Sequence, residues 1–288
     1  MTKASETSHA ILTATCADAV GLVAAVAGFF AERGINIIES SHFGDPDSRR
    51  FFQRTVFESG SAHPLSALRA EFAGLARRHG MDWQIFDAAR KARVLILVSR
   101  FDHCLNDLLY RYRTGSLAIE IPAIVSNHPE LEGLAAWHRV PFHHLPVTAS
   151  TRPAQEQAIA KLVEDLEIDL VVLARYMQVL SPGLVGKLAG RCINIHHSFL
   201  PSFKGAMPYQ QAHARGVKLI GATAHYVTPD LDEGPIIEQE VQRVDHTATP
   251  EALVAIGRDI ECQVLARAVR WHVERRVLLN GIKTVVLR

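Results

Sequence analysis

The apolar residues of the first part of the chain recur with the period of strands in four short runs and with the period of helices in two longer ones. The strand-like runs lie at residues 9–15, 35–43, 50–58 and 81–86, and the helix-like runs lie at 21–33 and 65–79. A turn sequence, Asp45-Pro46-Asp47-Ser48, separates the second and third strands. The pattern therefore predicts an N-terminal βαββαβ domain of the ferredoxin-like type, followed by a short charged hinge at 87–92 (DAARKA).

After the hinge, continuous β-branched runs alternate with helical patterns. The expected strands lie at 94–98, 118–126, 141–146 and 170–174, and the expected helices at 103–112, 131–139 and 152–166. Strands that alternate with helices predict a doubly wound, mostly parallel sheet. Thr249-Pro250-Glu251 marks the start of a long helix that runs to about residue 274, and Asn280-Gly281 marks a closing hairpin. We expect an α/β protein with two domains, 1–88 and 89–288.

Composition excludes several classes of partner. The chain has 288 residues, of which 48% are hydrophobic, and it carries 31 basic against 30 acidic residues. No basic block is present that would suit a nucleic acid, and no apolar run reaches the length of about 18 residues that a membrane helix requires. The four cysteines are widely spaced, which argues against a disulfide framework. The sequence thus predicts a cytoplasmic protein with a small-molecule substrate and no nucleic-acid or membrane partner.

Candidate chemistry lies in the stretch from Arg191 to Gly205, RCINIHHSFLPSFKG. Alternation along a strand puts Asn194 and His196 on one face and His197 on the other. Pro201 and Gly205 then break the strand, which leaves a loop at its carboxyl end, the edge where open α/β sheets bind ligands. A buried Asn and His that simply satisfy backbone groups would fit this stretch equally well.

A second polar stretch runs from Ala222 to Ile237, ATAHYVTPDLDEGPII. A β-rich run enters a turn-rich loop that carries Asp230, Asp232 and Glu233. Alone, such a loop is usually a solvated turn.

Together the two stretches resemble the folate-dependent formyltransferase fold family, through NIHxSxLPxxKG and then HxVTxxLDxGPII. The resemblance covers about residues 93–270. It implies a 10-formyltetrahydrofolate donor and a catalytic trio of Asn194, His196 and Asp232. An adjacent carboxylate favours the cationic form of His196, so the imidazolium and the Asn194 amide can both donate to the developing oxyanion. Asp232 can accept a proton from the nucleophile.

The N-terminal βαββαβ order, with GLVAAVAGFFAERGINI, resembles the ACT domain. That resemblance implies a small amino-acid effector bound across a subunit interface and a homo-oligomer. The usual Pro-Asp-Arg before the helix is here Ala17-Asp18-Ala19. Effector binding and a purely structural role in dimerisation therefore both stay open.

Nearly the whole chain is similar to the formyltetrahydrofolate deformylase family. This implies hydrolysis of the linear amide-type C–N bond of 10-formyltetrahydrofolate to formate and tetrahydrofolate, which balances the one-carbon pool and supplies formate for purine biosynthesis, without a further cofactor. After the strand at 94–98 the chain reads Ser99-Arg100-Phe101-Asp102-His103-Cys104, not a glycine-rich turn for a substrate phosphate. Two alternatives remain: a formyltransferase with an amine acceptor, and a non-catalytic folate or amino-acid sensor.

The same resemblance nominates a folate cleft. The segment ARYMQVL matches the family segment that lines the pteridine cleft, and the acidic loop is expected to close over the pterin. The candidate substrate-binding residues are Met177, Gln178, Val179, Leu180, His225, Thr228, Leu231 and Glu233. Met177, Val179 and Leu180 suit a packed core as well, and His225 suits either the orientation of Asp232 or water or a structural role. Gln178 is neutral where some relatives carry a basic residue, so the folate tail needs another group such as Arg175. Because His196 and His197 are expected on opposite faces, no metal site is predicted.

Overall fold

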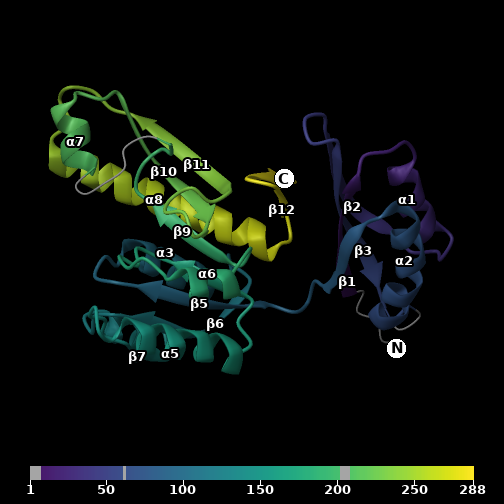
Figure 1. Cartoon of the computed structure of the whole chain (residues 1–288), viewed down its shortest axis with the longest axis horizontal. Coiled ribbons are helices and arrows are strands. Elements are labelled where there is room, and N and C mark those ends of the chain that lie inside the picture. The colour runs from purple at the N-terminus through teal and green to yellow at the C-terminus, as the bar shows by residue number, and fades with distance from the viewer. Residues whose placement is uncertain (1–7, 61–62, 202–207) are drawn as a thin grey trace, which may run out of the picture. The chain divides into compact units, whose positions relative to one another are not determined.

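The computed structural model describes residues 8–60, 63–201 and 208–288, and it forms two compact units (Figure 1). The first comprises the described part of Met1–Lys91 with Glu274–Asn280 and Val285–Arg288, and the second comprises Ala92–Val273 with Gly281–Thr284. The sequence did not predict that C-terminal segments belong to the first unit. The functional division at residue 88 stays a prediction, and the turn glycine Gly205 lies outside the described residues.

The first unit is a four-stranded sheet in the order β2-β3-β1-β4, with the predicted βαββαβ succession. Its elements are β1 (Ser8–Ala17), α1 (Leu22–Ala31), β2 (Ile37–Asp45), β3 (Arg50–Ser59), α2 (Leu65–His79) and β4 (Asp82–Asp87). The core forms where both helices cover one face of the sheet, around Phe30, Phe57 and Phe72, which are fully buried. This arrangement confirms the predicted class of the N-terminal part.

The C-terminal segment of the first unit is held by a network of charges. The guanidinium of Arg54, whose side chain is only 4% exposed, donates through Nη1 to Glu39 Oε1 at 2.8 Å and through Nε to the carbonyl of Glu274 at 2.9 Å. Arg276 Nη1 reaches the same Glu39 oxygen at 2.9 Å. Because Arg54 and Arg276 share the Glu39 carboxylate, loss of Glu39 would leave the nearly buried Arg54 cation without that anion.

The second unit contains a seven-stranded sheet in the order β11-β10-β9-β8-β5-β6-β7. The strands are β5 (Ala92–Val98), β6 (Ile119–Ser126), β7 (Phe142–His144), β8 (Leu170–Leu173), β9 (Cys192–His196), β10 (Leu219–Tyr226) and β11 (Ile236–Arg243). Neighbours from β7 to β9 run parallel, whereas β10 pairs antiparallel with both β9 and β11. The predicted mostly parallel sheet is confirmed.

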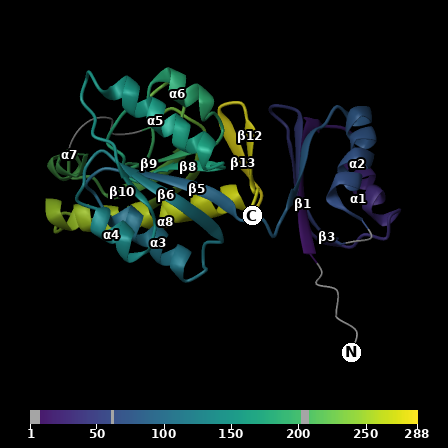
Figure 2. The same ribbon diagram turned by 90° about the horizontal axis from the view of Figure 1, so that it is seen from below.

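Helices cover both faces of this sheet. In Figure 2, α5 and α6 lie on one side of the strands and α3 and α8 on the other. The helices are α3 (His103–Arg113), α4 (Glu132–Trp137), α5 (Arg152–Asp165), α6 (Pro182–Lys187), α7 (Pro208–Ala214) and α8 (Pro250–Val273), and β12 (Val277–Asn280) and β13 (Lys283–Val286) form the predicted hairpin. The pattern analysis missed α6, α7 and the edge strand β11. No helix in the described part of the chain is long and apolar enough to span a membrane.

Candidate active site

The two polar stretches meet at the carboxyl end of β9. Strand β10 pairs with β9 so that Thr223 lies opposite His196 and His225 lies opposite Asn194. The loop after β10 then brings Asp232 back over both strands. Its Oδ2 is 3.3 Å from Nδ1 of His196, and its Oδ1 is 3.6 Å from Nε2 of His225. Residues that are far apart in the sequence therefore form one polar cluster, as the resemblance implied.

Backbone geometry fixes the position of Asp232. The residue has φ of +56°, a left-handed conformation that is costly for a side chain other than glycine and that clusters at functional sites. Two residues later, a Cβ added to Gly234 would lie 1.7 Å from the carbonyl oxygen of Tyr226, so only glycine fits there. A register shift between Ala224 and His225 further bends this end of β10. The loop is thus held by its backbone, and its acid is aimed at the histidines.

His225 links the amide and the acid of the cluster. Its Nδ1 lies 2.9 Å from the carbonyl oxygen of Tyr226, which only accepts, so Nδ1 carries a proton. Its Nε2 lies 3.3 Å from Nδ2 of Asn194. A neutral His225 accepts at Nε2 from the Asn194 amide, and a cationic His225 donates at Nε2 to Asp232. The protonation state of this ring therefore decides whether it orients the amide or the carboxylate.

The carboxyl group of Asp232 is strongly acidic in this setting. Hydrogen bonds from His196, and then from His225, hold its pKa well below the usual range, although partial burial opposes this shift. Asp232 is therefore ionised at neutral pH and accepts hydrogen bonds from Nδ1 of His196. That bond fixes a proton on Nδ1 of His196 and turns its Nε2 away from the acid.

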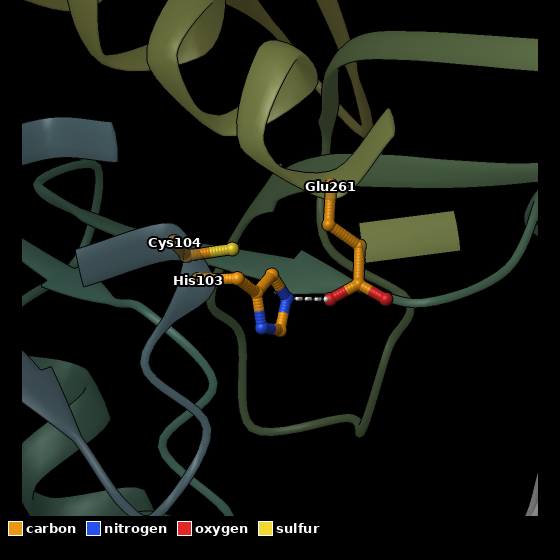
Figure 3. Close-up of side chains that lie close together, drawn as sticks. All are labelled: His103, Cys104 and Glu261. Atoms are coloured by element: carbon orange, nitrogen blue, oxygen red, sulfur yellow. Dashed lines mark hydrogen bonds and ion pairs between the residues drawn. The ribbon is translucent and has the colours of Figure 1, made fainter. Parts of the chain in front are cut away.

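A second carboxylate, Glu261 on α8, lies in the same part of the unit. Its side chain is 2% exposed, and it accepts from Tyr209 at 2.9 Å and contacts Nε2 of His103 at 2.8 Å, the bond drawn in Figure 3. Nε of Arg175 is 3.4 Å from the same carboxylate. Burial alone would raise the pKa of Glu261, but His103, Arg175 and Tyr209 outweigh it and leave the pKa below its usual range.

His197 lies beside His196, which corrects the prediction that the two rings point to opposite faces. The ring centroids are 4.9 Å apart with an interplanar angle of 27°. Strand β9 ends at His196, so the alternation of side chains does not extend to His197. Nδ1 of His197 is 2.6 Å from Nη1 of Arg175. Burial, together with the charges of Arg175 and His196, lowers the pKa of His197 to about 4, so the ring is neutral at pH 7.

One group of potential metal ligands occurs near this cluster. Ligand atoms of His103, Cys104 and Glu261 lie within 4.8 Å of one another, and Figure 3 shows their side chains converging from α3 and α8. The Arg175 guanidinium 3.4 Å from Glu261 already supplies the positive charge. A contact with Cys262, together with burial, raises the pKa of the Cys104 thiol well above its usual value, so the sulfur is protonated and is a poor ligand. The group is better explained as an anchor for Glu261, and the absence of a metal stays a prediction.

A cavity of about 670 Å³ brings both carboxylates and the predicted cleft together. It is lined by Asn194, His196 and Asp232 and by every predicted substrate-binding residue except Glu233, which is exposed: Met177, Gln178, Val179, Leu180, His225, Thr228 and Leu231. Met177, Val179 and Leu231 are 52%, 56% and 63% exposed. These three apolar side chains thus face solvent at the cavity, which a packed core would not allow.

The cavity also contains residues that the pattern analysis did not nominate. The titratable ones among them are His103, His197, Tyr209, Arg258 and Glu261. For Glu261 a signal was available, since it shares the apolar stripe of α8 with buried Gly257, Ile260, Val264 and Leu265. An acid on such a stripe is rarely buried without partners, which would have marked it for attention.

Comparison with known families agrees with this geometry. Residues 92–269 match the formyl transferase family, and residues 10–76 match the ACT domain family. A glycinamide ribonucleotide transformylase 1 from Symbiobacterium toebii has a similar structure over 70% of this chain and 97% of its own, with 30% identity and a TM-score of 0.66. Fold and site together define a formyl transferase domain preceded by an ACT domain.

Relatives that share both domains are more similar still. A formyltetrahydrofolate deformylase from Corynebacterium sp. (strain P-1) is 51% identical over 285 residues, which are 99% of this chain and 100% of the relative. The crystal structure of such a deformylase from Burkholderia mallei covers 98% of this chain and 100% of its own, at 54% identity and a TM-score of 0.93. The chain belongs to the formyltetrahydrofolate deformylase family.

Proposed function

We propose that this protein hydrolyses 10-formyltetrahydrofolate to formate and tetrahydrofolate with Asn194, His196 and Asp232 as its catalytic residues. The observation that carries the proposal is the convergence of the three side chains in one cavity, with Asp232 3.3 Å from His196. The deformylases that share its full length and both domains support the same reaction. By this reaction the protein balances the one-carbon pool and supplies formate for purine biosynthesis.

The first step is stabilisation of charge on the formyl oxygen. Attack at the formyl carbon converts a neutral carbonyl oxygen into an oxyanion. The Asp232 carboxylate binds Nδ1 of His196 and thereby leaves Nε2 of the imidazolium to donate to that oxygen. The Asn194 amide, 3.3 Å from His225, supplies the second donor. Each such donor typically contributes a few kcal/mol to transition-state stabilisation.

The second step is the transfer of the proton from water. Asp232 is ionised and lines the cavity, so it can accept a proton from the water that attacks the formyl carbon. The C–N10 bond then breaks, and N10 leaves with the proton that Asp232 took from water, so His196 keeps its Nε2–H. Water adds the second oxygen of formate, and no bond to the protein forms.

The exposed apolar side chains of the cavity suit the flat rings of a folate. Met177, Val179 and Leu231 would pack against the pterin and aminobenzoyl groups, and Thr228 fixes the closing loop by donating to the Asp230 carbonyl at 3.0 Å. Arg175 is occupied by Glu261 and His197. The exposed Arg258, which lines the same cavity, is therefore the better partner for the carboxylates of the folate tail than Arg175.

The remaining expectations belong to the same proposal. The reaction consumes only the folate and water, so it needs no cofactor. The ACT domain would bind a small effector, with an amino acid as the first candidate, and would join subunits into a homo-oligomer in the cytoplasm. Calorimetry with free amino acids, glycine first, tests the effector; heat that saturates at one ligand per ACT domain would support it, and no heat with any amino acid would leave the domain a structural role.

The direct test is formate release by the purified full chain from 10-formyltetrahydrofolate, without an amine acceptor or nucleotide. Equal amounts of formate and tetrahydrofolate are expected, with Asp232→Asn as the inactive control. Tight folate binding without formate would instead indicate a transferase that lacks its acceptor. Binding without turnover, unaffected by Asp232→Asn, would indicate a sensor.

A further inference from the structure

Two buried donors of the cavity are left without an acceptor. Nε2 of His196 and Nε2 of His197 are both buried and have no hydrogen-bond partner among the residues that the structure describes. Both residues line the cavity. A buried polar atom without a hydrogen-bond partner costs free energy. Its presence at a cavity therefore indicates that a ligand or a water molecule supplies the missing hydrogen bond.

The contacts of each ring decide which nitrogen carries a proton. Arg175 has no acceptor atom, so at 2.6 Å it donates to Nδ1 of His197, and the proton of the neutral His197 ring therefore lies on Nε2. His196 binds the Asp232 carboxylate through Nδ1, so its imidazolium form offers Nε2–H as well. The stacked rings, with centroids 4.9 Å apart, thus present two N–H donors side by side.

We propose that His196 and His197 form a two-point site for a small carboxylate, and that its ligand is the formate released in the reaction. The inference rests on the proposed hydrolysis and deepens it. One oxygen of formate accepts from Nε2 of His196 and the other from Nε2 of His197. Arg175 acts as a positioning residue, because its bond to Nδ1 of His197 holds the proton on Nε2.

The atom balance of the reaction gives His197 a role before product forms. The formyl oxygen remains on carbon throughout and becomes the formate oxygen bound to His196. The other oxygen comes from water, which loses one proton to Asp232 during attack, and from there to N10, and the second proton to solvent as the carboxylate forms. Since that oxygen meets His197 in the product, Nε2–H of His197 lies beside the attacking water. A water oxygen can accept this bond with one lone pair and attack with the other.

The surroundings of Arg175 favour a small anion over the folate tail. Glu261, which is 2% exposed, forms an ion pair with the guanidinium of Arg175. Glu261 is itself held by contacts with His103 and Tyr209. The side chain of Arg175 itself is 11% exposed. A long, charged tail needs an open path to solvent, whereas formate arises inside the cavity next to these donors. Arg258 remains the exposed basic group of the cavity for the tail.

Two substitutions of His197 separate its nitrogens. In His197→Asn the amide oxygen takes the place of Nδ1 and keeps an acceptor for Arg175, but the Nε2 donor is lost. In His197→Gln the amide nitrogen takes the place of Nε2 and keeps the donor.

We would titrate each full-length protein with ¹³C-formate and follow binding by NMR. Separately, we would measure how strongly added formate inhibits the production of tetrahydrofolate from the substrate. A hydrogen bond to a charged acceptor is worth about 1.5–3 kcal/mol, so His197→Asn should weaken formate binding about 10- to 100-fold and His197→Gln by less than about 3-fold. Acetate, which has an extra methyl group, should bind more weakly than formate to all three proteins.

The outcomes distinguish the two proposals. Formate release by the wild type, with equal formate binding in wild type and His197→Asn, would overturn the carboxylate site and leave the hydrolysis intact. No formate release at all would overturn the hydrolysis, whatever formate binding showed. A rise in KM for polyglutamyl over monoglutamyl substrate in His197→Asn, with formate binding unchanged, would assign the donors to the folate tail instead. Melting curves of both variants exclude loss of the fold as the cause.

Discussion

The cavity holds two carboxylates that differ in how they are held. Asp232 lies on a loop in a left-handed conformation, is 15% exposed and contacts two histidines at 3.3 and 3.6 Å. Glu261 lies within the long helix α8, is 2% exposed and is bound at 2.8 and 2.9 Å by His103 and Tyr209, with Arg175 at 3.4 Å. The first has long contacts and a strained backbone, and the second has short contacts and a regular one.

This difference indicates a division of labour. A group that must receive a proton benefits from contacts that can lengthen and shorten, whereas a group that only positions others benefits from complete burial and several partners. Asp232 thus suits proton transfer, and Glu261 suits the role of an anchor that fixes Arg175, which in turn fixes His197. The comparison fails if the two acids respond alike to substitution.

The largest effect is expected for Asp232→Asn. The amide can still contact His196 but cannot accept the proton of water or hold the imidazolium by charge. We expect kcat to fall by about 10²- to 10⁴-fold with little change in folate binding, since both effects act in the transition state. Single-turnover kinetics with a separate binding titration measures the two quantities.

The kcat of His196→Ala should also fall by at least about 10²-fold, because the variant lacks the donor to the oxyanion. An unchanged kcat in either variant would contradict the mechanism.

Glu261→Gln should affect stability more than chemistry. It removes the negative charge that faces Arg175, 11% exposed, and breaking a buried pair costs about 3–5 kcal/mol, so we expect a loss of about 2–4 kcal/mol in the free energy of unfolding. The matched control is Asp165→Asn. Asp165 pairs with Lys161 on the surface, where their side chains are 53% and 72% exposed, so loss of this pair should cost less than about 1 kcal/mol. Denaturant unfolding measures both. If Glu261→Gln lost activity as strongly as Asp232→Asn without losing stability, the division of labour would be wrong.

The sequence predicted one side of this comparison and not the other, for a physical reason. Asn194, His196 and Asp232 were nominated because the two local motifs that contain them resemble those of the formyltransferase family. The strand-end register that brings His225 opposite Asn194 follows from the antiparallel pairing of β9 and β10, which a pattern of single strands does not contain. Glu261 and Arg175 meet only through the packing of α8 against the sheet. Their pairing therefore depends on the tertiary structure and leaves no local pattern in the sequence.

His197 illustrates the limit of periodicity. Alternation predicted its ring on the face opposite His196, but the strand stops one residue earlier and the rings stack. Boundaries of elements are what patterns locate least well, and here one residue reversed a conclusion about the site. Likewise β11 was missed because its exposed, charged outer half, with Glu240 and Arg243, hides the apolar alternation of an edge strand. The fold class survived both errors because it depends on the central β5 and β8 runs, which are buried at every position except Arg93.

The buried, neutral His197 should make the free energy of unfolding depend on pH in the acid range. The pKa of His197 falls from its ordinary 6.5 to about 4 in the folded protein, so between these values the unfolded chain binds a proton there and the folded chain does not. Stability therefore decreases as the pH falls through this window, by up to about 2–3 kcal/mol near pH 4. His197→Asn removes the titrating ring and should flatten the curve. Unfolding free energies of both proteins at several pH values test this; parallel curves would mean that His197 is not the group responsible.

The smallest effect concerns His225, which contacts Asp232 and Asn194 and for which the sequence left open an orienting and a structural role. His225→Gln keeps an amide nitrogen near Nε2 while it removes the charge that a histidine can carry. If His225 only orients its neighbours, kcat should fall by about 10-fold or less with KM nearly constant, which is well below the effect of Asp232→Asn. Steady-state kinetics of the two variants side by side gives the ratio. A loss equal to that of Asp232→Asn would place His225 in proton transfer itself, and a loss of stability with kcat unchanged would make it a structural histidine bound to the carbonyl of Tyr226.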